Sequence, residues 1–106
     1  MNLLEETKVA IVESHHSIED VMFVGSSDGE YRLTFEEFAK VSDFEYDNGF
    51  GQQEIPPYII VYFKDGSYLE REEYDGAEWW TWVPDRVFSE DDQYKKPDNL
   101  FDLWDK

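Results

Sequence analysis

The stretch that decides the fold reads Tyr58-Ile59-Ile60-Val61-Tyr62-Phe63, Lys64-Asp65-Gly66, Ser67 to Tyr74, Asp75-Gly76 and Glu78 to Val83. Its runs are rich in β-branched and aromatic residues, which is typical of strands. Asp-Gly between two such runs favours a type I′ hairpin turn, and it occurs twice here. Pro84 ends the third run because proline cannot donate a hydrogen bond to a sheet. The stretch therefore predicts a three-stranded antiparallel meander.

Upstream of the meander, the sequence predicts a helix, a hairpin and a second, short helix. Helix formers fill Leu3–Ser14 and place an apolar stripe on one side. The apolar runs Val21–Val24 and Tyr31–Leu33 flank the turn cluster Gly25–Gly29, which indicates a hairpin. Thr34-Phe35-Glu36-Glu37 is a capping box that starts the second helix. The apolar face of that helix is formed by Phe35, Phe38, Ala39 and Ser42. We expect an α+β fold with one twisted antiparallel sheet.

Length and aromatic content indicate one folded domain over residues 1–106. A chain of 106 residues can bury a core without disulfides, and its 18% of aromatic residues argues against disorder. Residues 85–106 have few periodic features and are expected to form an extended tail that packs on the sheet. The apolar residues of the tail that would clamp it there are Leu100, Phe101, Leu103 and Trp104.

The charge balance excludes some partners and favours others. The chain has 26 Asp and Glu against 9 Lys and Arg, which gives a formal net charge of −17. Such a surface repels phosphate, so we expect no direct binding to nucleic acid or to acidic membranes. Basic proteins, above all nucleic-acid-binding ones, are the favoured partners. The alternative is that the acidity serves only solubility.

No residue pattern indicates catalysis or a cofactor. There is no Cys, and no motif positions a Ser nucleophile, so we expect no enzymatic activity. His15 and His16 fall at the predicted end of the first helix, where an imidazolium is favoured by the helix dipole. The N-terminal residues lack the basic and apolar regions of a signal peptide, and we expect a cytoplasmic protein.

Carboxylates on the predicted strands have a spacing that suggests mimicry of nucleic acid. Residues two apart on a strand face the same way about 6.6 Å apart, close to the roughly 7 Å between consecutive phosphates. Glu70 and Glu72 have this spacing, as do Asp28 and Glu30. The other expected partner contacts are Asp43, Glu45 and Asp47 in the loop before the meander and Glu73, Asp75 and Glu78 around its second turn. The alternative is an ordinary solvated sheet face.

The acidic loop also suggests a calcium site. Asp43, Glu45, Asp47 and Glu54 occupy positions 1, 3, 5 and 12 of an EF-hand-like loop. Two features oppose this hypothesis: Asn48 stands where the loop requires Gly, and Pro56-Pro57 forbids the exiting helix. A calcium-binding module through the Asp43–Glu54 loop is therefore kept as an alternative function.

The Trp79-Trp80-Thr81-Trp82 segment suggests a contact surface. Alternation along a strand puts Trp80 and Trp82 on one face and Trp79 on the other, so one face can present Trp to solvent. An exposed Trp80 with an acidic rim would be a binding hot spot. The alternatives are packing in the core and a small module that binds a peptide or ligand through the Trp79–Trp82 face.

Three segments resemble small, acidic, uncharacterised proteins of bacteria and their phages. These segments are Asp28-Gly29-Glu30-Tyr31-Arg32-Leu33-Thr34-Phe35-Glu36-Glu37-Phe38, Phe63-Lys64-Asp65-Gly66-Ser67-Tyr68-Leu69-Glu70-Arg71 and Tyr74-Asp75-Gly76-Ala77-Glu78-Trp79-Trp80. In size and charge the chain is also similar to phage DNA mimics that inhibit restriction, CRISPR or repair nucleases. Those inhibitors share no motif, so the resemblance implies a class of function and assigns no residue roles.

Overall fold

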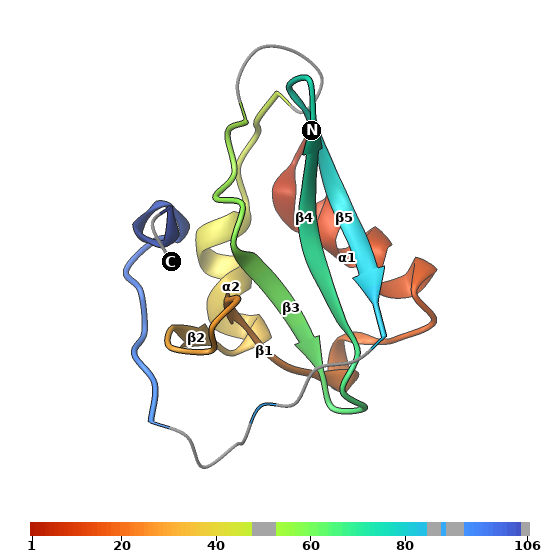
Figure 1. Ribbon diagram of the computed structural model, residues 1–106, viewed down its shortest axis with the longest axis vertical. Helices are drawn as coiled ribbons and strands as arrows, with labels where there is room; N and C mark the ends of the chain where they lie inside the picture. Colours follow the sequence, from red (N-terminus) through yellow and green to blue (C-terminus); the bar gives the residue numbers. More distant parts are fainter. Residues whose placement is uncertain (48–52, 85–87, 89–92, 105–106) are drawn as a thin grey trace.

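The computed structural model describes residues 1–47, 53–84, 88 and 93–104. It is an α+β fold in which two α-helices lie on one face of a five-stranded antiparallel sheet with the order β2-β1-β3-β4-β5 (Figure 1). The helices are α1 (Leu3–Glu13) and α2 (Phe35–Ser42), and the strands are β1 (Val21–Ser26), β2 (Arg32–Leu33), β3 (Ile59–Phe63), β4 (Tyr68–Tyr74) and β5 (Ala77–Val83). Short 3-10 helices occupy Ile18–Asp20 (η1) and Leu100–Leu103 (η2). No helix in these ranges has the length and apolar character needed to cross a membrane.

The predicted α+β class is confirmed, but the sheet is larger than the predicted meander. Strands β3, β4 and β5 form the meander, and β1 then pairs with β3 through Val24 and Val61. This pairing joins the first hairpin to the meander in one sheet. It connects strands far apart in the chain, which local turn chemistry does not reveal.

The first hairpin has different bounds from those predicted. Strand β1 continues past Val24 through Gly25 to Ser26, whereas β2 is reduced to Arg32–Leu33. Gly25 belongs to the strand and not to the turn: a Cβ at this position would meet the carbonyl oxygen of Tyr31 at 1.8 Å. Glycine is therefore needed for close approach of the two strands.

The two Asp-Gly turns differ. At the β4–β5 turn both Asp75 and Gly76 have positive φ, 53° and 89°, as a type I′ turn requires. The type I′ prediction is wrong for Asp65-Gly66, because only Gly66 has positive φ there. The Gly66 amide donates to the Phe63 carbonyl and the Phe63 amide donates to the Ser67 carbonyl. This is a three-residue loop with a bulge at glycine, which accommodates an ordinary φ at aspartate.

Both α-helices begin at capping residues. The Asn2 side chain accepts from the Glu5 amide at the start of α1. The predicted capping box is confirmed at the start of α2, where Thr34 Oγ1 accepts from the Glu37 amide at 3.1 Å and the Glu37 carboxylate accepts from the Thr34 amide at 2.9 Å. These contacts satisfy amides that have no partner within a helix.

The main core lies between the sheet and the helices. Leu3, Leu4 and Ile11 of α1 and Phe38 of α2 pack there against the sheet, for example against Val61. The tail contributes Leu100 and Leu103, both fully buried, whereas Phe101 and Trp104, the other two residues of the predicted clamp, are exposed. A smaller cluster, Phe23, Ile60 and Tyr62 with Met22, Tyr68 and Phe88, lies apart from the main core. Tail residues 85–87 and 89–92 are outside the described ranges.

Candidate functional site

A buried ionic cluster lies under the β4–β5 hairpin. The Arg71 Nη2 donates to Glu78 Oε1 at 2.8 Å, and both side chains are completely buried. The same guanidinium donates to Glu6 at 3.3 Å and to the Tyr46 hydroxyl at 3.1 Å, and it stacks 4.8 Å from the Trp80 ring centroid. The Tyr46 hydroxyl in turn donates to Glu6. One cation is thus surrounded by two carboxylates, a phenol and an indole.

The surroundings shift the pKa values of two members of this cluster. Burial opposes the charged guanidinium, but Glu6, Tyr46 and Glu78 more than offset it, so the pKa of Arg71 is raised. Burial and the hydrogen bond to Glu6 raise the pKa of Tyr46. Arg71 therefore stays charged and Tyr46 stays neutral at physiological pH.

Glu78 joins the hairpin to the acidic loop. Its carboxylate accepts from the amide of Glu54 at 2.7 Å and from the amide of Ile55 at 3.2 Å. The prediction that Glu78 contacts a partner from the surface is therefore wrong. Alternation along β5 places Glu78 on the helix-facing side, where the carboxylate is compensated by Arg71 and two amides.

Trp80 packs partly in the core, which is the alternative that the sequence left open for this segment. Its indole Nε1 donates to Thr7 Oγ1 of α1 at 3.0 Å, and its ring packs against the main core. It is half-buried and holds α1 to the sheet. The exposed indoles are those of Trp79 and Trp82, with exposed fractions of 41% and 49%.

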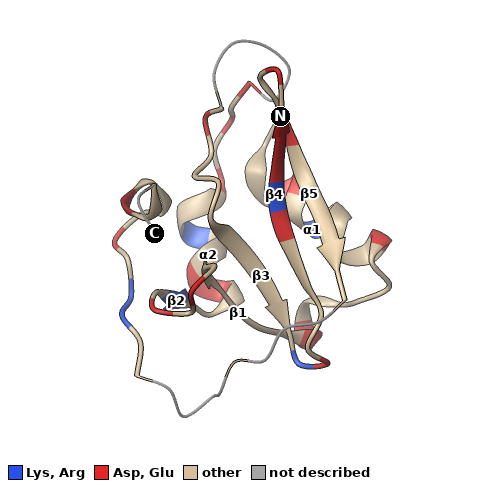
Figure 2. Ribbon diagram, viewed as in Figure 1, with Lys and Arg blue, Asp and Glu red and all other residues tan. Residues whose placement is uncertain are grey.

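The Glu78 contacts bring several of the predicted acidic residues to one end of the molecule. Glu54 is held at the start of β5, and its carboxylate accepts from the Asp47 amide at 2.6 Å. Figure 2 shows acidic residues along the upper half of β4, at its turn to β5 and in the neighbouring loop. We call this end the acidic tip and define it by Asp47, Glu54, Glu72, Glu73 and Asp75. Of the predicted contacts, Asp47, Glu72, Glu73 and Asp75 lie here.

The outer face of the hairpin, on the side of the sheet away from α1, combines carboxylates with aromatic rings. Glu70, Glu72 and Tyr74 alternate along β4 on this side, and Trp79 lies directly across from Glu72 on β5. Tyr74 has an exposed fraction of 76%. The predicted pair Glu70 and Glu72 therefore lies on one side of a regular strand.

The other predicted acidic residues are engaged elsewhere. Asp43 accepts from the Asn2 side chain at 2.9 Å, and Glu45 pairs with the N-terminal amine at 3.1 Å. Asp28 accepts from the Glu30 amide within the β1–β2 turn, and the Glu30 carboxylate pairs with Lys95 of the tail at 3.3 Å. Asp43 and Glu45 are thus held by the first two residues of the chain, and Asp28 and Glu30 lie at the β1–β2 turn, so we do not count these four among the residues of the tip.

The geometry of the acidic loop does not support the calcium alternative. Asp43, Glu45, Asp47 and Glu54 are all among the described residues, and the described part of the chain contains no group of three or more His, Asp or Glu side chains placed to hold a metal. Asn48 and Gly49, on which the loop comparison also depends, are outside the described residues.

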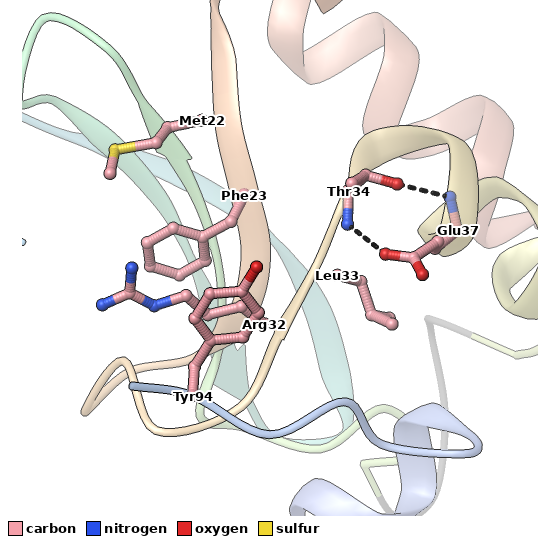
Figure 3. Close-up of a pocket in the computed structure, with 7 residues that line it drawn as sticks. All are labelled: Met22, Phe23, Arg32, Leu33, Thr34, Glu37 and Tyr94. Carbon is pink, nitrogen blue, oxygen red and sulfur yellow. Dashed lines mark hydrogen bonds between the residues drawn. The ribbon is translucent and has the colours of Figure 1, made fainter. Parts of the chain in front are cut away.

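A hollow of about 170 Å³ lies beside β1 and β2 (Figure 3). The Arg32 guanidinium stacks there on Phe23 and on Tyr94 of the tail, at 4.5 and 5.3 Å from the ring centroids. Glu37 lines the hollow, and its hydrogen bond to Lys96 lowers its pKa. Its carboxylate is already engaged by Lys96 and the Thr34 amide. The hollow is thus a junction of tail and sheet.

A second hollow, of about 200 Å³, lies between α1 and β5. It is lined by Ala10, Glu13, Ser14, Leu69, Trp80 and Trp82. Sequence reasoning did not find it, because it requires α1 to pack across β5. The usable signal was the alternation that puts Trp80 and Trp82 on one side of the strand.

In comparisons with protein-family models, curated proteins and solved structures, the chain has no match.

Proposed function

We propose that this protein binds the basic, nucleic-acid-binding surface of another protein and acts by occupying it, with no catalytic step. The contacts are the acidic tip and the carboxylates of the outer face of β4. The observation that carries the proposal is the buried pair of Arg71 and Glu78, which holds acidic segments from separate parts of the chain at one end. The carboxylates of these segments are therefore held in place before the partner arrives, so little conformational entropy is lost on binding.

The arrangement on β4 suits a surface made for nucleic acid. Glu70 and Glu72 repeat at about 6.6 Å along a strand, close to the roughly 7 Å between phosphates. Tyr74 and Trp79 expose large rings among these carboxylates, and such rings are frequent anchors in interfaces. A groove lined by Lys and Arg would meet charge at the expected repeat and exposed rings next to Glu72.

The test compares two triple variants of equal charge change. Glu72→Gln, Glu73→Gln and Asp75→Asn neutralise the tip, whereas Glu5→Gln, Glu19→Gln and Glu36→Gln neutralise three exposed carboxylates of α1, η1 and α2. We expect the immobilised wild-type protein to capture a nucleic-acid-binding protein from bacterial lysate at low salt. The tip variant is expected to lose capture at least about tenfold, which corresponds to 1.4 kcal/mol.

Two further measurements distinguish occupation of a nucleic-acid-binding groove from non-specific attraction by the net charge. Capture should fall steeply with salt, since exposed charges are screened, and added duplex DNA or RNA should release the partner. Equal loss in both triple variants would show that only net charge matters. Capture that resists competing nucleic acid would refute occupation of the groove.

A further inference from the structure

Strand β5 lies at one edge of the sheet. Among the described strands it pairs with β4 alone, and Figure 1 shows it at the border of the sheet with α1 behind it. The two-residue turn at Asp75-Gly76 makes Tyr74 and Ala77 a hydrogen-bonded pair, so alternate residues of β5 bond to β4. The backbone N–H and C=O groups of Trp80 and Trp82 therefore point away from β4.

Each side of this edge presents an apolar surface next to a carboxylate, although different residues form the two surfaces. On the outer side, the exposed Trp79 is the cross-strand neighbour of Glu72, so an indole and a carboxylate share this side of the edge. On the helix-facing side, the hollow between α1 and β5 is lined by the apolar side chains of Leu69, Trp80 and Trp82 and also by Glu13. Both sides therefore combine aromatic or aliphatic surface with negative charge.

We propose that β5 accepts an extended, basic segment of the partner as a sixth, edge strand. The inference rests on the proposed function for the sign of the partner's charge, and it adds the mode of recognition. Backbone hydrogen bonds to Trp80 and Trp82 supply affinity, as in other cases of strand addition. Side chains that alternate between the two sides of the sheet supply the preference for Lys and Arg.

Lys and Arg fit both sides for the same reason. An added strand lies about 4.8 Å from β5, so its outward side chains meet Trp79 and extend across it toward Glu72 on β4. A cation over an indole face is attracted by the ring quadrupole. On the other side, a long aliphatic stem fills the hollow while its charged end reaches the carboxylate of Glu13.

The first test uses a capped peptide of seven residues, the length of β5, in which Lys and Thr alternate. Its control has the same sequence with every backbone nitrogen methylated, so the charge is kept and strand pairing is lost. We expect the unmodified peptide to bind at least tenfold more tightly. We also expect NMR hydrogen exchange to show protection of the Trp80 and Trp82 amides when it binds.

The second test separates the backbone of the edge from its side chains. Trp82→Ala removes the indole and keeps the outward N–H, whereas Trp82→Pro removes both. Pro is tolerated here because this N–H does not bond to β4. We expect Trp82→Pro to bind the peptide at least fivefold more weakly than Trp82→Ala, with circular dichroism and thermal unfolding used to confirm that both variants fold.

The outcomes distinguish the two proposals. Protection of the two amides together with a preference for the unmodified peptide supports strand addition. Equal, salt-sensitive binding of both peptides without that protection overturns strand addition and leaves the acidic surface intact as a binder of basic chains. If neither peptide binds, strand addition is overturned. The capture experiment with the triple variants then decides the proposed function on its own.

Discussion

At the scale of single residues, Glu78 has the most consequences for the rest of the structure. Its carboxylate accepts from Arg71 and from the amides of Glu54 and Ile55, with no exposure to solvent. A buried charge is tolerated only when it is paired and fully hydrogen-bonded. Glu78 therefore links strand, loop and ionic cluster at one point.

Neutralising this residue should destabilise the fold strongly. Glu78→Gln removes one of the two carboxylates that pair with Arg71. The NH₂ group of the new side chain can also face the backbone N–H groups of Glu54 and Ile55, which need an acceptor. We expect a loss of about 3–5 kcal/mol in the free energy of unfolding, measured in urea. The control Glu72→Gln, on the exposed side of the same hairpin, should change it by less than about 0.5 kcal/mol. Similar effects in the two variants would contradict the structural role of Glu78.

Asp65 connects the end of α1 to the β3–β4 turn. Its carboxylate accepts from the hydroxyl and the amide of Ser67 at 2.6 and 2.9 Å, and it lies 2.8 Å from His16 Nε2. The His16 ring stacks on Phe63 with a centroid distance of 3.8 Å. The hydrogen bonds from Ser67, and then that of His16, lower the pKa of Asp65 from 3.8 to about 2.

This shift predicts a pH dependence. Because the folded chain lowers the pKa of Asp65, the charged carboxylate stabilises the fold fully above about pH 4, and this contribution is lost as the pH falls toward 2. The difference in unfolding free energy between wild type and Asp65→Asn should therefore shrink between pH 4 and 2. Urea unfolding at several pH values measures it. A difference that is constant over this range would contradict the assignment.

At the scale of elements, α1 ends in a motif that normally contains glycine. The His16 amide donates to the Ile11 carbonyl and the His15 amide to the Val12 carbonyl, which together form a Schellman motif. His15 occupies its left-handed position with a φ of 64°. At the predicted helix end, His15 therefore supplies the left-handed residue, and the His16 ring lies 2.8 Å from the Ser14 carbonyl through Nδ1 and 2.8 Å from Asp65 through Nε2.

Replacing His15 should stabilise the chain. A non-glycine residue in the left-handed conformation costs about 1–2 kcal/mol, and glycine carries no such cost. We expect His15→Gly to raise the free energy of unfolding by about 0.5–1 kcal/mol, as read from urea denaturation. His15→Ala is the matched control, because it removes the same imidazole and keeps the strain. A gain in His15→Ala as large as in His15→Gly would refute the backbone explanation.

At the scale of the whole molecule, the negative charge opposes the compact state. With a formal net charge of −17, most of the 26 carboxylates lack a cation to pair with, and their mutual repulsion favours expansion. Gathering several of them at the acidic tip concentrates this repulsion at one end. Salt screens it, since the Debye length falls from about 30 Å at 0.01 M to about 3 Å at 1 M.

Salt should therefore raise the thermal stability. We expect the Tm to increase between about 0.01 and 0.5 M NaCl, as measured by circular dichroism, because screening removes more repulsion than attraction in this chain. The triple tip variant should show a smaller increase than wild type. A Tm that falls with salt would mean that the ion pairs of the chain outweigh its repulsion.

Local chemistry accounts for what the sequence predicted correctly. Helix formers and an apolar stripe identified the first α-helix, the capping box identified the second, and the apolar runs separated by Asp-Gly identified the strands of the meander. The turn type at Asp75-Gly76 followed from the same rule, but the identical dipeptide at Asp65-Gly66 forms a bulged loop. The alternation that placed Glu70 and Glu72 together is also a local property of a strand.

The sequence by itself therefore determined the two α-helices, the strands of the meander, the α+β class and the net negative charge. Only the tertiary structure decided the pairing of β1 with β3, the burial of Glu78 beside Arg71, the loop held against β5 and the hollow under Trp82. The physical reason is that a charge pattern does not show which side of a strand faces the core. That side is set by packing between residues distant in the chain. For this reason Glu78, which the sequence predicted as a surface contact, is buried and holds the acidic loop against the hairpin.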